Sequence, residues 1–151
     1  RMKQPPAHIK RRRADYLARR SECEYHSALR LSGITPGWLS GVGWTPHDEL
    51  APTEVDHLFG RNGVEDDAEH ASNYMAAHWI VHNWKTDHDR LGRILAIWWK
   101  HALRFDEPDG WEPERMSRVF GQDVLGWLEN QSEQVPELFR GLIAEVIEGD
   151  Q

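Results

Sequence analysis

The chain has 151 residues and a mass of 17.6 kDa, which suits a single domain of ordinary size. Hydrophobic residues make up 39% of the sequence and tryptophan occurs eight times, which excludes an intrinsically disordered chain. The net charge of −7 is unevenly placed: residues 1–30 carry nine Lys or Arg against three acids (+6), and residues 107–151 carry three Arg against eleven acids (−8). This asymmetry predicts a basic arm that binds polyanions and an acidic region that faces solvent or another protein.

Cysteine content and hydropathy indicate the setting of the protein. Cys23 is the one cysteine, so an intramolecular disulfide is impossible, and a reducing, cytoplasmic location is favoured. We find no apolar run long enough to cross a bilayer, and no apolar stretch follows the basic N-terminus. We therefore expect neither membrane association nor a secretory signal.

The predicted elements begin with a cationic helix over residues 10–24. Residues 1–20 form the basic arm, and its charged run consists of Lys10, Arg11, Arg12 and Arg13. This run is a candidate DNA contact, the alternative being a solvated helix without a ligand. Residues 31–53 follow and are rich in Gly, Pro, Ser and Thr, which predicts a loop or a short hairpin.

Two short strands are predicted in the middle of the chain. Residues 54–59 can form the first strand, with Val55, Leu58 and Phe59 as its apolar anchors, and residues 73–75 can form the second. Residues 60–72 between them read as an acidic loop, and a helix follows from about residue 76 to residue 85. The predicted order is therefore strand, loop, strand and helix.

Helices are predicted for the remainder of the chain. Apolar residues recur at helical spacing over residues 89–104, 112–130 and 135–148, and a proline occupies the first turn of the second and third helices. We expect residues 89–151 to be a helical extension of the same single domain that supports the core or docks a protein partner or a second copy. The predicted fold class is α+β and mostly helical.

Four residues in the strand–loop–strand–helix region carry the candidate chemistry: Asp56, His57, Asn73 and His82. Asp56 and His82 can hold a divalent cation, while His57 takes a proton from water and Asn73 orients its ring. Mg²⁺ or Mn²⁺ suits a mixed Asp/His site that keeps several waters, and Ni²⁺ or Zn²⁺ suits the imidazole. Adjacent strand residues point to opposite faces, so a bulge or a strand end is needed to aim Asp56 and His57 at one site.

The intervals among these residues resemble the HNH endonuclease family over about residues 20–88. The shared pattern is an Asp-His pair, then Gly60-Arg61, then Asn73, and a His nine residues later at position 82. The resemblance implies a ββα-metal nuclease core at residues 21–88 that hydrolyses DNA in a bacterium or a phage-infected host. It also implies that Asp56 and His82 bind the metal, that His57 is the general base oriented by Asn73, and that Arg61 contacts phosphate.

The chain departs from the family at the structural zinc that many members hold with two pairs of cysteines. Three of the four corresponding positions can still bind zinc: Cys23, His26 and His78. The fourth is Val81, which is not a ligand, so a complete site would need His47 or His88. We expect no structural zinc, and we expect the additional helices and tryptophans to supply the hydrophobic core instead.

Two alternatives follow from these departures. His78 and His82 are four residues apart, as in zinc hydrolases, but Trp79 occupies the position where those enzymes have a Glu. His78 then reads more simply as a hydrogen-bonded structural histidine. The alternative to an active nuclease is a catalytically inactive HNH-fold module that binds DNA or protein.

Overall fold

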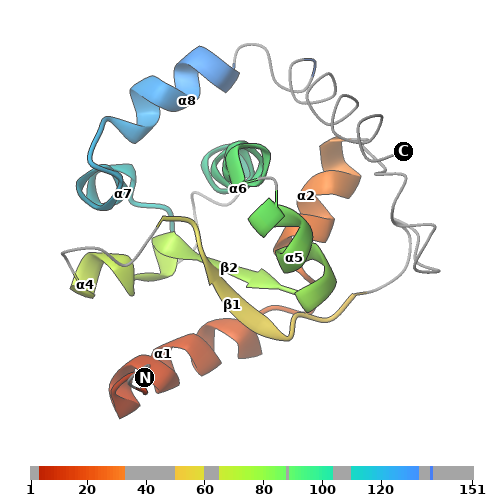
Figure 1. Ribbon diagram of the computed structural model, residues 1–151, viewed down its shortest axis with the longest axis vertical. Coiled ribbons are helices and arrows are strands. Elements are labelled where there is room, and N and C mark those ends of the chain that lie inside the picture. The colour runs from red at the N-terminus through yellow and green to blue at the C-terminus, as the bar shows by residue number, and fades with distance from the viewer. Residues whose placement is uncertain are drawn as a thin grey trace.

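The computed structural model describes residues 4–32, 50–59, 65–87, 89–103, 110–132 and 137. Within these residues the protein is α+β and mostly helical, as predicted, with helices around a small antiparallel sheet (Figure 1). The elements are α1 (Ala7–Ala18), α2 (Glu24–Ser32), β1 (Glu54–His57), α4 (Glu65–Ala68), the 3₁₀ turn η1 (Ala71–Asn73), β2 (Tyr74–Ala77), α5 (Trp79–Asp87), α6 (Asp89–Leu103), α7 (Pro113–Phe120) and α8 (Val124–Ser132). No helix of the described part is both long and apolar enough to cross a membrane.

The two predicted strands are confirmed and pair with each other. β1 and β2 are antiparallel, and Asp56 lies opposite Met75 while His57 lies opposite Tyr74. Alternation gives the sheet two different faces. Met75 and Ala77 belong to the larger hydrophobic core, whereas Tyr74 belongs to a smaller cluster on the other face.

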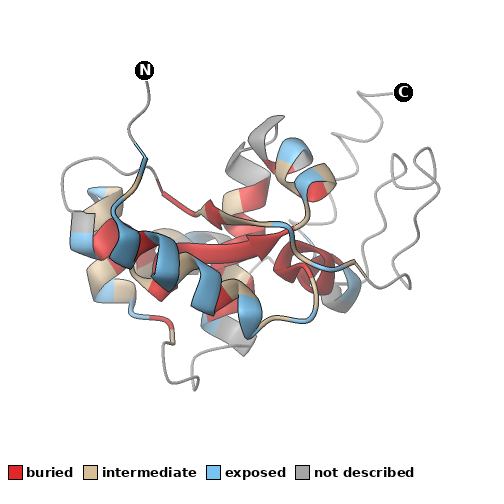
Figure 2. Ribbon diagram, turned by 90° about the horizontal axis from the view of Figure 1, so that it is seen from below, coloured by how far each residue is buried: buried red, intermediate tan, exposed pale blue. Residues whose placement is uncertain are grey.

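Helices cover both faces of the sheet. In Figure 1 the strands lie between α1 on one side and α2, α5 and α6 on the other. Ile9 and Tyr16 are buried and hold α1 in place, and Figure 2 shows exposed residues along the outer side of this helix with the buried strands behind it. α6 packs against α2 and α5 and contributes Ile94 and Leu95 to the core, so it is central rather than an appended extension.

Several predicted boundaries differ from the structure for local reasons. The helix predicted over residues 10–24 is two helices, because α1 ends at Ala18 and α2 begins at Glu24. The helix predicted over residues 112–130 is also two, because Gly121 ends α7 with a positive φ of 82° that favours glycine. The acidic loop contains α4 and η1. The helix predicted over residues 135–148 lies, apart from Glu137, outside the described residues, as does most of the predicted loop at residues 31–53.

Candidate metal and catalytic site

Asp56 and His82 come together across the junction of β1 and α5. The Nε2 atom of His82 lies 3.0 Å from Oδ1 of Asp56, and its Nδ1 atom lies 2.9 Å from Oε2 of Glu54. Glu54 and Asp56 are two residues apart in β1, so both point to the face that α5 covers. Sequence reasoning missed Glu54, although its two-residue spacing from Asp56 was a usable signal.

Hydrogen bonds and neighbouring charges shift the pKa values of His82 and Asp56. The hydrogen bond that His82 donates to Asp56, with help from Glu54, raises the pKa of His82 to about 9 against the opposing effect of burial. Burial raises the pKa of Asp56, but hydrogen bonds and charge from His82, Lys85 and Tyr25 outweigh it and lower the pKa. At neutral pH His82 is therefore an imidazolium that lies between the Asp56 and Glu54 side chains.

Two further side chains fix the Asp56 carboxylate. The Tyr25 hydroxyl, which is fully buried, donates a hydrogen bond to Oδ2, and the Lys85 Nζ atom lies 3.2 Å from the same oxygen. The Lys85 stem passes over Gly92, where a Cβ atom would lie only 2.3 Å from Lys85 Cγ. Asp56 is thus held through Oδ2, and Oδ1 is turned toward His82.

The two predicted metal ligands, Asp56 and His82, lie next to each other. The 3.0 Å between Asp56 Oδ1 and His82 Nε2 is a hydrogen-bond distance, so a cation would have to replace the proton that these two atoms share. Glu54 contacts the other ring nitrogen, and among the described residues no three His, Cys, Asp or Glu side chains are grouped to hold one ion. The predicted Mg²⁺ or Mn²⁺ site would therefore have two protein ligands, Asp56 and His82, with water completing it.

Replacing Tyr25 with phenylalanine is expected to weaken Mn²⁺ binding by about 10- to 100-fold, because the change removes the hydrogen bond that orients a metal-binding carboxylate. Isothermal titration calorimetry at fixed pH measures this affinity. Tyr74→Phe is a matched control, because it removes a buried tyrosine hydroxyl that contacts Glu69 rather than Asp56. Equal affinities for the Tyr25→Phe variant and the wild type would contradict the positioning of Asp56.

His57 is the last residue of β1 and takes partners different from those of Asp56. Its Nε2 atom lies 2.9 Å from Oε2 of Glu69, and its ring meets the Tyr74 ring edge-on at 5.4 Å. Pairing in β1 is regular through His57, so its side chain lies on the α1 face while Asp56 faces α5. The expected bulge is absent from β1, and the structure does not aim the Asp56 and His57 side chains at one site; they lie on the two faces of the strand.

Glu69 is a buried acid on this second face, and several side chains form hydrogen bonds with it. It is 3% exposed and receives both Nε and Nη2 of Arg13, at 2.9 and 2.8 Å, and the Tyr74 hydroxyl at 2.8 Å. Burial raises the pKa of Glu69, but the hydrogen bonds of Arg13 and Tyr74 and the charges of His57 and Arg13 outweigh it and lower the pKa to about 2. Glu69 is therefore ionised at neutral pH. Sequence reasoning missed it, because it lies within a predicted acidic loop of no apparent order.

Asn73 closes the connection between the strands. Its Oδ1 atom accepts from the Phe59 backbone N–H at 2.9 Å, and its Nδ2 atom donates to the Phe59 and Ala68 carbonyl oxygens at 3.2 and 2.8 Å. The predicted hydrogen bond from Asn73 to the His57 ring is therefore corrected: the side chain binds backbone groups, and the ring contacts Glu69. Asn73 supports His57 indirectly, by fixing the turn that follows β1.

The predicted basic arm is docked on the sheet. Arg12 donates to the Glu69 carbonyl oxygen at 2.8 Å and Arg13 pairs with the Glu69 carboxylate, whereas Lys10 and Arg11 are exposed. Arg13 is thus engaged within the protein and not directed at a ligand. The predicted phosphate contact Arg61 lies outside the described residues.

The segments that correspond to the zinc positions lie side by side but use other partners. Burial raises the pKa of the Cys23 thiol to about 11, against opposing hydrogen bonds that include one with the His78 backbone. His26 Nδ1 lies 2.9 Å from Oε1 of Glu22, and His78 Nδ1 accepts from the backbone N–H of Ile80 at 3.3 Å. Val81 is buried in the hydrophobic core.

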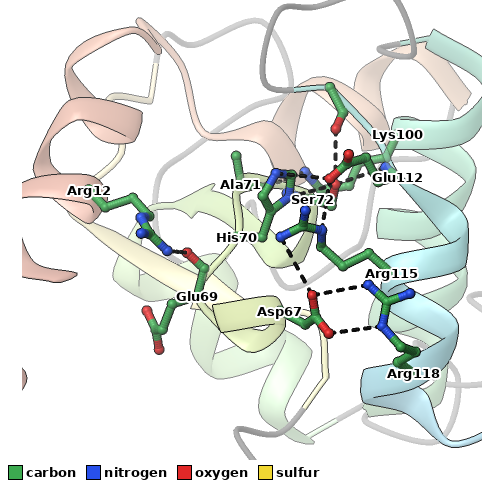
Figure 3. Close-up of polar contacts among 11 residues, drawn as sticks. Arg12, Asp67, Glu69, His70, Ala71, Ser72, Lys100, Glu112, Arg115 and Arg118 are labelled. Atoms are coloured by element: carbon green, nitrogen blue, oxygen red, sulfur yellow. Dashed lines mark hydrogen bonds and ion pairs between the residues drawn. The ribbon is translucent and has the colours of Figure 1, made fainter. Parts of the chain in front are cut away.

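A network on α7 holds the loop that carries Glu69. Asp67 pairs with Arg118 at 3.0 Å and with Arg115 at 3.5 Å, and His70 pairs with Glu112 at 3.0 Å. Figure 3 shows the Glu69 carboxylate turned away from this network. A surface hollow of about 380 Å³ beside α7 is lined by residues between 111 and 118, none of which belongs to the candidate site.

No known family model, curated protein or solved structure matches this chain. Function must therefore be inferred from side-chain geometry and chemistry.

Proposed function

We propose that this protein is a metal-dependent endonuclease of the HNH type that hydrolyses phosphodiester bonds in DNA. The observation that carries the proposal is the 3.0 Å approach of Asp56 Oδ1 and His82 Nε2, with His57 next in β1. Asp56 and His57 come from β1 and His82 comes from α5, and β2 lies between these elements in the chain. In this proposal the hairpin and α5 form a ββα-metal motif supported by packing and not by zinc.

In the proposed reaction the metal ligands lie on one face of β1 and the general base lies on the other. Asp56 and His82 would hold a divalent cation, which supplies positive charge beside the charge that develops on phosphate oxygens. His57 takes a proton from a water whose oxygen attacks phosphorus, and the phosphorus–oxygen bond opposite breaks; its electron pair leaves on the sugar oxygen, which takes a proton from solvent water. Among the described residues β1 pairs on one edge only, with β2. A phosphate at its other edge would be reachable from both faces.

DNA is the favoured substrate because α1 places positive charge beside this region. Lys10 and Arg11 are exposed on the helix that packs on β1 and β2, and Arg12 joins α1 to Glu69. A local basic surface binds phosphates in a protein of net negative charge. α1 thus provides a surface along which a duplex could lie.

The test is nicking of supercoiled plasmid by the purified full chain in Mg²⁺, Mn²⁺ or Ni²⁺, each measured separately. We expect nicked circles in at least one cation and none after addition of EDTA. Intact plasmid in all three cations would contradict the proposed activity.

Replacing Lys10 and Arg11 together with glutamine is expected to weaken DNA binding without lowering thermal stability, because both side chains are exposed. The slope of log affinity against log salt should become shallower by about 0.9 for each phosphate that the variant no longer neutralises. Fluorescence anisotropy with a labelled duplex at several salt concentrations measures the slope. Arg118→Gln on α7 is the control for removal of an exposed arginine, and an equal slope for the double variant and the wild type would exclude α1 as the DNA-binding surface.

A second candidate function is an inactive HNH-fold module that binds DNA or a protein partner. It is favoured by the ion pairs at Asp56, since His82 contacts Oδ1 and Lys85 contacts Oδ2. This candidate predicts salt-sensitive DNA binding with no Mn²⁺ binding and no nicking. Calorimetric titration with Mn²⁺ distinguishes the two candidates.

A further inference from the structure

We propose that Glu69 is the positioning residue for His57, fixing its ring in the Nε2–H form so that Nδ1 is the nitrogen that takes the proton from water. This inference rests on the proposed endonuclease function and adds to that function the atom that acts as the base. The corresponding role was expected of Asn73, whose amide binds the Phe59 and Ala68 backbone instead.

The contact geometry supports this assignment. Oε2 of Glu69 lies 2.9 Å from His57 Nε2, and other donors form hydrogen bonds with both oxygens of the same carboxylate. Arg13 donates two hydrogen bonds and the Tyr74 hydroxyl a third, so the carboxylate cannot rotate without breaking them. A bidentate Arg–carboxylate pair is geometrically restrictive. The Tyr74 ring also meets the His57 ring edge-on, which limits its tilt.

The direction of the His57–Glu69 hydrogen bond follows from charge. A carboxylate that receives Arg13 and Tyr74 is ionised, and an ionised carboxylate only accepts hydrogen bonds. The proton in this contact therefore resides on His57 Nε2. A neutral imidazole carries one N–H, so its basic nitrogen is Nδ1. A hydrogen-bond partner on one ring nitrogen of a histidine thus determines that the other nitrogen is the one that reacts.

A purely structural role makes a different prediction. If Glu69 served only to anchor α1 through Arg13, its loss would lower stability and would leave the His57 tautomer and the turnover of folded enzyme unchanged. If Glu69 positions His57, its loss alters the ring's tautomer and lowers kcat, while KM for DNA changes little because no phosphate-binding group is removed.

The experiment combines ¹⁵N NMR of histidine-labelled protein with nuclease kinetics. The His57 signal is identified by its absence from the His57→Ala spectrum. In the wild type we expect a protonated Nε2 and an unprotonated Nδ1; in Glu69→Gln we expect a mixture of tautomers and a fall in kcat of about 10- to 100-fold. Asp66→Asn removes an exposed acid three residues away and should match the wild type in both measurements.

A wild-type spectrum with the proton on Nδ1 would overturn the inference, and so would an unchanged His57 tautomer in a folded Glu69→Gln variant. The wild-type spectrum alone decides the matter if that variant does not fold. The tautomer is measured without turnover, so a protein with the Nε2–H form that cuts no DNA contradicts the proposed function and not the positioning of His57.

Discussion

Replacing His57 with alanine is expected to lower the rate of metal-dependent plasmid nicking by about 100- to 10,000-fold, the usual contribution of a general base. The side chain is 14% exposed and makes no contribution to the Asp56–His82 pair, which lies on the other face of β1. Mn²⁺ affinity should therefore be retained. Gel-based kinetics under saturating DNA, with calorimetry on the same preparation, separates the loss of the base from loss of the metal.

His101→Ala is the matched control for this experiment, because His101 is an exposed histidine in the last turn of α6. It should nick plasmid at the wild-type rate. Equal rates for His57→Ala and His101→Ala would remove His57 from the mechanism. A His57→Ala variant that has also lost Mn²⁺ affinity would show that the two faces of the strand are not independent.

The local order of the hairpin region was predictable because its signals are short-range. Short apolar anchors between turn-forming segments identified both strands, and the interval between Asn73 and His82 placed a histidine one helical turn into α5. α5 follows β2 after a single residue, so His82 has little freedom in where it lies relative to Asp56. The pairing of these two side chains at 3.0 Å is consistent with that constraint.

The partners of His57 were not predictable, because they depend on interactions between distant segments. Glu69 lies in a loop without apolar periodicity, and Arg13 lies in a helix that sequence reasoning treated as a DNA-binding arm. Their pairing requires α1 to pack on the sheet, which Ile9 and Tyr16 accomplish with only two buried positions. Two apolar positions are enough to predict a helix, but they do not show which surface the helix packs against. All four residues of the basic run were predicted to be DNA contacts, whereas in the structure two of them contact Glu69.

Replacing Glu24 with alanine is expected to lower the free energy of unfolding by about 3–5 kcal/mol, because it leaves a buried cation without its acid. Glu24 is 2% exposed and accepts from the Tyr16 hydroxyl, from the Ala76 backbone N–H at 3.0 Å and from Trp99 Nε1 at 2.9 Å. The buried ammonium of Lys100 supplies the nearby positive charge. This one carboxylate links α1, α2, β2 and α6, and urea unfolding measures its contribution.

Glu24→Gln tests whether charge and hydrogen-bond direction are both required. The Ala76 N–H and the Trp99 indole N–H only donate, and they contact different oxygens of Glu24. The amide NH₂ of glutamine would therefore face a donor in either orientation, and we expect most of the stability loss to persist. Glu114→Ala, at an exposed position of α7, should change stability by less than about 0.5 kcal/mol.

The same carboxylate should give the protein an acid-sensitive stability. Burial raises the pKa of Glu24, but Lys100 and the hydrogen bonds of Ala76, Tyr16 and Trp99 outweigh it, so the folded-state pKa lies below the ordinary value of 4.5. A depressed pKa contributes stability that is present above the unfolded value and is lost as pH falls through the folded value. The wild type should therefore lose stability below pH 4.5 more steeply than Glu24→Gln, as measured by urea midpoints at successive pH values. Parallel curves for the two proteins would show that Glu24 does not stabilise the fold through its charge, and the stability of the site's scaffold would then depend on packing alone.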